Sequence, residues 1–420
     1  MNKKNIKLYA LANLISNTKE AYLVFINEFT TVFRDRGVML VLVLAPIIYP
    51  LLYASIYRNE TSRDVPIAVV NDSKSDLSRR LLRNIDASPD VKIENYYLNI
   101  EEAKKAFYAR KVNGVIFIPA DFDKKLKTQQ QATLSVYCDM SSFMYYRALM
   151  MGSNYAVLDM NKQVQLERLN AQGVSGEAAM IQSDPIAYDA NIMFNEGMGF
   201  ASFLLPAVLI LILHQTLFFG ISMVAGTARE ENRSHRLVSS KFSGRGIFRV
   251  VFGKAMCYFL IYLIWIFFIL IIIPRLFNLP HIGHAMDIFK LMLPFLLATI
   301  FFSMTISVFF QNRETGMIVF LFFSLILLFL SGISWPMSNI NWFWRAFGWL
   351  FPATHGIQGY IKINSMGGDL HSVYYEYLSL WTQTAFYFIT ASLAYTWQMR
   401  RKTPEEIEEL IDNNSLKIEL

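Results

Sequence analysis

Residues 200–224 read FASFLLPAVLILILHQTLFFGISMV and hold no Asp, Glu, Lys or Arg. A helix needs about 20 mostly apolar residues to cross the hydrocarbon core of a bilayer, because no water is there to satisfy its backbone. Further apolar runs of similar length lie on both sides of this one. The predicted spans are Val38–Tyr57, Phe200–Val224, Ala255–Ile273, Leu291–Phe310, Gly316–Ser334 and Tyr374–Trp397. We therefore predict a polytopic α-helical membrane protein with six transmembrane helices.

The overall composition favours the same class. Of the 420 residues, 54% are hydrophobic and 17% are charged, whereas soluble proteins carry about 25% charged residues. Cys138 falls between the first and second predicted spans, whereas Cys257 falls within the third. We therefore expect no disulfide between them. The basic start of the chain has no sustained apolar core and no small-residue cleavage site, which disfavours a cleaved signal peptide.

The distribution of Lys and Arg predicts the orientation of the spans. Residues 1–37, 225–254 and 399–420 and the short QNRET loop together hold 18 of them, whereas the loops 274–290 and 335–373 hold four. Basic residues concentrate on the cytoplasmic side. We expect both termini in the cytoplasm of a cell (inner) membrane protein, with residues 58–197 outside. That external segment balances 17 basic with 18 acidic residues, so the net charge of +6 implies no nucleic-acid partner.

The external segment has the pattern of a small α/β domain. Four runs rich in β-branched and aromatic residues predict strands: VPIAVVND, VKIENYYL, VNGVIFIPA and ATLSVYCDM. Helical segments around Asp76–Ile85 and Glu101–Arg110 separate the first three, and such alternation is typical of an α/β sheet. The fold class is thus a helical membrane protein with an α/β domain inserted between helices 1 and 2.

Two further segments suit the membrane surface. In KEAYLVFINEFTTVFRDRG, before the first span, apolar residues repeat at helical spacing, which predicts an amphipathic helix on membrane lipid; a soluble core-packing helix is the alternative. Residues 335–365 begin with four tryptophans in fifteen positions, a residue that concentrates at membrane interfaces. We expect short re-entrant or interfacial outer helices broken at Pro336 and Pro352; a water-exposed loop is the alternative. The first span contains Pro46 and Pro50, which predict a kink.

Polar residues inside or next to the spans are the candidate functional residues. His214, Gln215 and Thr216 lie within an apolar run, where polar groups are costly. They indicate a substrate path or dimer interface, or else a hydrogen-bonded packing cluster. A second group, AREENRSHR at 228–236, stands between two spans on the predicted cytoplasmic side. It is either a contact surface for another protein or a solvated positive-inside loop.

Three stretches together resemble the permease subunits of type-2 ABC exporters, in the branch with a large extracytoplasmic domain. They are FASFLLPAVLILILHQT at 200–216, AREENRSHRLVSSKFSGRGIFRVVFGK at 228–254 and LSGISWPMSNINWFWRAFGWLFPATHGIQGY at 330–360. The last resembles the family pattern of Leu-Ser-Gly, a Pro, an aromatic helix and a turn before an amphipathic helix. Within it, the candidate residues of the outer interfacial segment are Ser331, Gly332, Trp335, Pro336, Pro352 and His355.

The resemblance implies a function and a set of partners. In this family the loop after the second span is a coupling helix that contacts a separate ABC ATPase, which binds the ATP and Mg²⁺. Here that implies Arg229, Glu230, Glu231, Asn232, Arg233, Ser234, His235 and Arg236. The resemblance further implies a non-catalytic subunit that dimerises with a second copy or paralogue and exports an amphipathic or hydrophobic molecule. A periplasmic adaptor protein is a further partner that such an external domain can dock.

The chain departs from the family at one motif. The family usually has Gly-Thr followed two residues later by Glu in the coupling helix, where this chain has Arg233, Ser234 and Arg236. One hypothesis is that this chain is the diverged half of a heteromeric pair.

Missing motifs limit the alternatives. The chain has no Walker A sequence, G-x-x-x-x-G-K-[ST], so ATP would have to act through another chain. It also has no H-E-x-x-H, G-x-S-x-G or cysteine cluster that would indicate a hydrolase or a metal site. The lack of buried carboxylates in the spans disfavours an ion-coupled transporter. The alternative from another class is a non-transporting membrane receptor or scaffold that binds ligands with its external domain.

Overall fold

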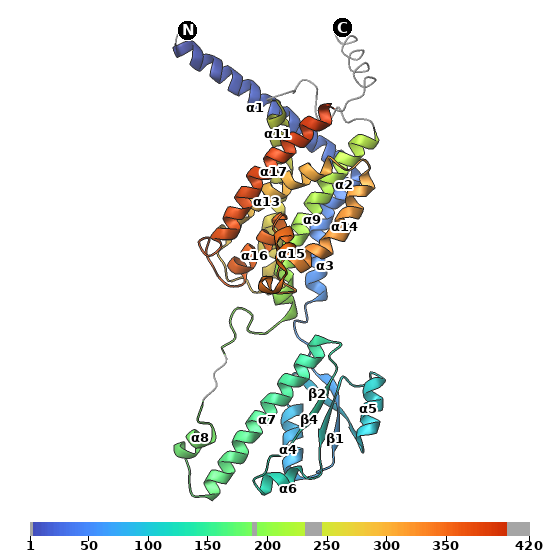
Figure 1. Ribbon diagram of the computed structural model, residues 1–420, viewed down its shortest axis with the longest axis vertical. Coiled ribbons are helices and arrows are strands. Elements are labelled where there is room, and N and C mark those ends of the chain that lie inside the picture. Colours follow the sequence, from blue (N-terminus) through green and yellow to red (C-terminus); the bar gives the residue numbers. More distant parts are fainter. Residues whose placement is uncertain (1–2, 187–190, 232–245, 401–420) are drawn as a thin grey trace. The chain divides into compact units, whose positions relative to one another are not determined.

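The computed structural model describes residues 3–186, 191–231 and 246–400. These divide into two compact units, one made of residues 1–58 with 194–420 and the other of residues 59–193 (Figure 1). We call them the helical unit and the sheet unit.

The sheet unit contains a four-stranded sheet in the order β2-β1-β3-β4. Strand β1 pairs in parallel with β2 and β3, and β4 runs antiparallel to β3. Alternate residues of β1 face two cores: Ile67 packs with α4 and α7, and Ala68 packs with α5. The bounds are β1 Val65–Asn71, α4 Asp76–Asp86, β2 Val91–Tyr97, α5 Ile100–Tyr108, β3 Gly114–Ile118, α6 Phe122–Lys127, β4 Ser135–Cys138, α7 Phe143–Ala171 and α8 Glu177–Ser183. Whether this unit is extracytoplasmic stays a prediction.

The helical unit is a bundle built around α9, whose residues are mostly buried. Its elements are α1 Lys3–Arg34, α2 Arg36–Met39, α3 Ala45–Ile56, α9 Phe200–Glu230, α11 Gly246–Phe267, α12 Ile273–Leu276, α13 Ala285–Ser307, α14 Arg313–Leu330, α15 Trp342–Gly348, α16 Pro352–Asn364 and α17 Tyr374–Arg400. We call the end of the bundle at Glu230 the inner end and the end at Phe200 the outer end, after the predicted orientation.

Five of the described helical stretches are long and apolar enough to cross a membrane. They are Arg36–Ile56, Phe200–Glu230, Gly246–Leu276, Ala285–Ser307 and Arg313–Leu330. The sixth predicted span is also helical, as the 27-residue α17, but it is not among these five. Six crossings therefore stay a prediction.

Several prolines lie within the spans, and at two of them, Pro46 and Pro274, a neighbouring helix supplies a donor to a carbonyl one turn earlier. Pro46 has no N–H to donate to the carbonyl of Leu42, and that carbonyl instead accepts a bond of 2.9 Å from the Trp265 indole. At Pro274 the freed carbonyl of Leu270 accepts from the Tyr360 hydroxyl, at 3.4 Å. A π-helical turn lies just before each proline, at Leu40–Leu44 and Phe268–Ile272. Neighbouring helices thus supply the donors that these spans lack.

Candidate functional site

The inner end of α9 differs from the sequence expectation. Helix α9 continues six residues past the predicted end of its span, and α11 begins before the predicted start of the next span. The reason is that polar residues continue a helix readily once it has left the hydrocarbon. Arg229 and Glu230 therefore form the last turn of α9, and Glu231 is its C-cap. Asn232, Arg233, Ser234, His235 and Arg236 lie outside the described residues.

Arg229 points into the helical unit and closes the end of α13. Its guanidinium donates to the carbonyl of Ser307, at 2.6 Å, and to the carbonyl of Phe310. A second guanidinium nitrogen reaches the side-chain oxygen of Gln398, at 3.4 Å. The last carbonyls of a helix have no partner within the helix and carry its negative dipole end. A cation bound there ties α9 to α13.

Arg313, the first residue of α14, connects three elements. Its backbone N–H donates to Glu230 Oε1 at 2.8 Å. Its guanidinium donates to both carboxylate oxygens of Asp35, at 3.2 and 3.0 Å. Asp35 is also the N-cap of α2, where it accepts from the backbone N–H groups of Gly37 and Val38. We call Asp35, Arg229, Glu230 and Arg313 the clasp.

A second ionic contact lies deeper, between α1 and α11. Lys254 Nζ donates to Glu28 Oε2 at 2.6 Å, and the Tyr258 hydroxyl donates to Glu28 Oε1 at 2.6 Å. The side chains of Lys254 and Glu28 are 4% and 5% exposed. Buried charges of this kind must be paired and hydrogen-bonded to be tolerated. The pair therefore holds α1 firmly against α11.

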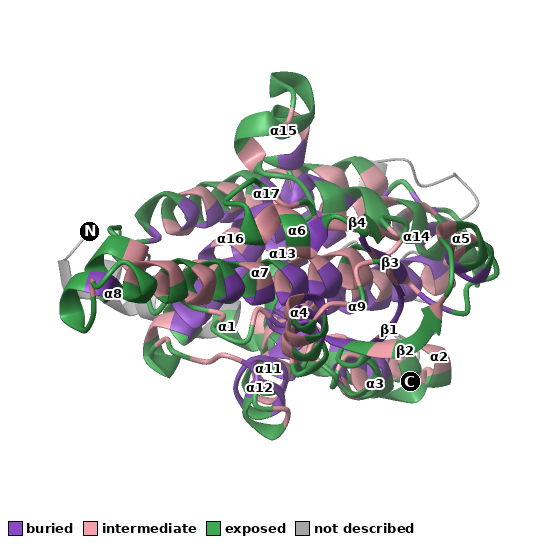
Figure 2. Cartoon of the chain, turned by 90° about the horizontal axis from the view of Figure 1, so that it is seen from below, coloured by how far each residue is buried: buried purple, intermediate pink, exposed green. Residues whose placement is uncertain are grey.

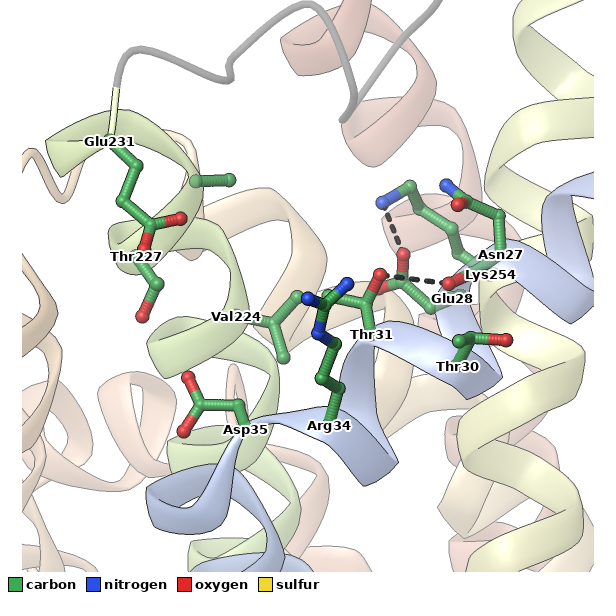
Figure 3. Close-up of a pocket in the computed structure, with 11 residues that line it drawn as sticks. Asn27, Glu28, Thr30, Thr31, Arg34, Asp35, Val224, Thr227, Glu231 and Lys254 are labelled. Carbon is green, nitrogen blue, oxygen red and sulfur yellow. Dashed lines mark hydrogen bonds and ion pairs between the residues drawn. The ribbon is translucent and has the colours of Figure 1, made fainter.

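A polar pocket of about 370 Å³ lies between the clasp and this buried pair. Figure 3 shows side chains of α1 and α9 on its walls, with the Glu28–Lys254 contact beside it. Among the lining residues are Asn27, Glu28, Arg34, Asp35, Thr227 and Glu231. Helix α9 ends at this pocket. The pocket therefore adjoins residues 228–236, the segment for which we expect a contact with another protein.

The His214 group lies inside the helical unit. His214 and Thr216 are buried, and the His214 ring lies 6.0 Å from that of Phe302. Thr216 accepts a bond of 2.9 Å from the Tyr262 hydroxyl of α11. Gln215 is half-buried. Both interpretations of this group, a substrate path or dimer interface and a hydrogen-bonded packing cluster, stay predictions.

The outer tryptophan-rich segment folds as two short helices, α15 and α16, and α16 begins at Pro352. Most residues of helix α15 are exposed (Figure 2). Four tryptophan side chains of this segment are exposed as well: Trp335, Trp342, Trp344 and Trp349. His355 is buried in α16 and lies 3.3 Å from the Trp349 carbonyl. Exposed indoles are what an interfacial segment requires.

Ser331 and Gly332 end α14 and border an outer pocket. Gly332 has a φ of +86°, a left-handed conformation that favours glycine at the end of a helix. The Gln358 amide donates to the Ser331 carbonyl at 2.9 Å and so joins α16 to α14. The pocket, of about 360 Å³, is also lined by Phe203 and Ile361. Polar side chains, among them Asn195, Gln358 and Lys362, also line it, and a mainly apolar cleft with convergent polar groups is typical of small-molecule sites.

Sequence reasoning missed most of the clasp and the buried pair. In the sequence, Asp35 is only one polar residue near the end of an amphipathic segment, and Arg313 is only one positive charge among many. A stronger signal existed for Glu28, which stands four residues after Val24 and four before Val32, on the side of α1 that packs inward.

Comparison with known proteins identifies the family. A family model described as "ABC-2 family transporter protein" matches residues 36–393. No curated protein matches the chain significantly. The match covers most of the chain and includes every candidate span, the clasp from Arg229 to Arg313 and both outer helices. The chain is a multi-pass membrane protein and belongs to the ABC-2 family of transporter proteins.

Proposed function

We propose that this chain is the permease subunit of an ATP-driven exporter and that a separate ATPase docks on residues 229–236. The family implies an ABC ATPase partner, and the chain itself has no Walker A sequence. The proposal places both termini in the cytoplasm and residues 58–197 outside the cell (inner) membrane.

The observation that carries the proposal is the way α9 ends. Its 31 residues make a helix about 46 Å long, about 15 Å more than the hydrocarbon core of a bilayer. Its last turn binds the end of α13 through Arg229 and the start of α14 through Glu230. A force applied just beyond Glu230 therefore acts on three spans at once, which is the requirement for coupling to a partner outside the membrane.

A second permease, either a copy of this chain or a paralogue, completes the proposed transporter. Helix α14 offers a surface for it, because its apolar side chains Met317, Leu321, Phe322 and Leu325 are 52–70% exposed in the single chain, where either lipid or a second permease can cover them. The substitutions at Arg233, Ser234 and Arg236 relative to the family favour a heteromeric pair. If a homodimer of this chain had full transport activity, the heteromeric pair would be excluded.

The proposed substrate is an amphipathic or hydrophobic small molecule, such as a drug or lipid, taken from the cytoplasm or inner leaflet. The mainly apolar lining of the outer pocket supports this class over a sugar. The sheet unit is proposed to dock a periplasmic adaptor where the cell has one.

The test is to isolate the tagged chain gently from its native membrane and identify what accompanies it. We expect an ATPase with a Walker A sequence to accompany the wild type and the control Arg36→Glu, whose side chain is exposed near the clasp. The double variant Arg233→Glu/Arg236→Glu should lose it. If the wild type brings no ATPase while other membrane complexes stay intact, a receptor or scaffold becomes the better explanation.

A further inference from the structure

Arg313 occupies the one position in the clasp that contacts both α9 and the start of the first span. We infer that Arg313 is a positioning residue that transmits movement of the inner end of α9 to the first span through Asp35. The inference rests on the proposed function, because it assumes an ATPase that moves α9.

The contact between α9 and Arg313 leaves little room for independent movement. Glu230 holds the backbone N–H of Arg313, at 2.8 Å. One turn earlier, α9 has Gly226, and a Cβ built there would lie 2.7 Å from the Cα and N atoms of Arg313. The missing side chain lets the start of α14 lie directly on the α9 backbone. Arg313 must therefore follow α9 when it shifts.

The contact between Arg313 and Asp35 carries that shift onward. The two hydrogen bonds, of 3.2 and 3.0 Å, join a planar guanidinium to both carboxylate oxygens. This geometry fixes direction as well as distance, which a lysine ammonium does not. Asp35 stands at the corner between α1 and α2 with an extended backbone, and it caps the helix that leads into the span Arg36–Ile56. A pull on its carboxylate acts on the first turn of that span.

Two of the ion pairs at the inner end, Glu28–Lys254 and Asp35–Arg313, differ in how far water reaches them. The Glu28–Lys254 pair is almost fully buried and already attaches α1 to α11. Breaking such a pair leaves an uncompensated charge in a low-dielectric interior. The Asp35–Arg313 side chains are 20% and 31% exposed, so water reaches both partners. A contact of this second kind breaks and re-forms at lower cost, as a transmitting contact requires.

The test uses hydrogen–deuterium exchange on the co-purified complex of the full chain with its ATPase, with and without MgATP and vanadate. In the wild type we expect the nucleotide to change exchange in peptides covering residues 220–231 and also in those covering 34–44. In Asp35→Asn and Arg313→Ala, the response at 220–231 should remain, whereas the response at 34–44 should fall by about fivefold or more, the range of typical coupling between sites.

The variants separate coupling from folding. Asparagine caps a helix as well as aspartate does, so Asp35→Asn keeps the start of α2 while it removes the charge and replaces one of the two oxygens that accept from Arg313 with a donor NH2 group. Arg313→Lys keeps the positive charge but loses the planar guanidinium that binds both carboxylate oxygens. Its change in exchange at residues 34–44 should therefore be smaller than that of the wild type and larger than that of Arg313→Ala. Arg36→Ala is the matched control, because it removes an exposed arginine next to Asp35, and it should behave as the wild type. If Arg313→Ala does not yield a complex, Asp35→Asn and Arg313→Lys decide the result.

The outcomes distinguish this inference from the function on which it rests. An undiminished response at 34–44 in Asp35→Asn would overturn the role of Arg313 while leaving the ATP-driven permease intact. A wild type that carries no ATPase would overturn the proposed function and this inference together.

Discussion

The two ends of the helical unit hold their helices together by different chemistry. At the inner end, ion pairs join separate helices: Glu20 to Arg249, Glu28 to Lys254 and Asp35 to Arg313. At the outer end, neutral side chains donate to backbone carbonyls, as Thr354 does to Gly348, Gln358 to Ser331 and Gln383 to Trp349. One ion pair, between Lys362 and Glu376 at 2.6 Å, also joins α16 to α17 there.

The difference indicates what each end is built to do. A side chain bound to a backbone carbonyl fixes a local conformation, and the α15–α16 segment is held mainly in this way. An ion pair between helices depends on how those helices sit relative to one another, and it changes when they move. Under the proposed function, the inner end is where a partner's movement would change the contacts between helices, and the outer end would keep its shape around the pocket at Ser331.

The largest predicted effect comes from breaking the buried ion pair. Lys254→Met leaves the Glu28 carboxylate buried without a cation, which should cost about 3–5 kcal/mol of stability. The double variant Glu28→Gln/Lys254→Met removes both charges and should recover most of that loss. Thermal unfolding of the purified protein measures both. A double variant no more stable than Lys254→Met would show that the loss does not come from an unpaired buried carboxylate.

A smaller effect is expected where α9 meets α14. Gly226→Ala brings a methyl group to within 2.7 Å of backbone atoms of Arg313, and overpacking of this kind costs about 1–3 kcal/mol. Thermal unfolding should show the loss, and Gly197→Ala, where a Cβ meets nothing within 4 Å, is the matched control. Equal stability of the two variants would contradict the close seating of Arg313 on α9.

At the outer end, a single neutral contact should matter less. Thr354→Val keeps the shape of a buried side chain but removes its 2.7 Å bond to the Gly348 carbonyl. The expected loss is about 1 kcal/mol, measured by the same unfolding assay. A loss as large as that of Lys254→Met would remove the distinction drawn between the two ends.

The smallest effect is a pH dependence at the outer end. Burial lowers the pKa of His355, although the Trp349 carbonyl and the Glu376 charge act in the opposite direction. The folded chain therefore favours neutral His355. The contribution of His355 to the stability of the fold is complete above the unfolded pKa of about 6.5, and this contribution is lost as the pH falls below that value. The unfolding temperature of the wild type should drop more between pH 7 and pH 5 than that of His355→Gln. If the unfolding temperatures of the wild type and His355→Gln fell equally between pH 7 and pH 5, the role of His355 in this pH dependence would be contradicted.

The sequence predicted what depends on local composition. Long apolar runs located five of the six predicted spans to within nine residues, and Pro352 marked the start of α16. It did not predict the clasp or the buried pair, because Asp35 and Arg313 are 278 positions apart and Glu28 and Lys254 are 226 apart. Nothing near Arg313 in the sequence distinguishes a bridging arginine from one that marks the cytoplasmic side.

The most direct test of the central claim is to find what touches the chain just beyond α9. A photoreactive benzoylphenylalanine would replace Ser234, and in a control Trp335 of the outer segment, and native membranes would be illuminated. We predict that position 234 forms a cross-link to a protein with a Walker A sequence and that position 335 does not. Cross-links to an ATPase from neither position, with both variants inserted normally, would contradict the claim that this permease is driven from the inner end of α9.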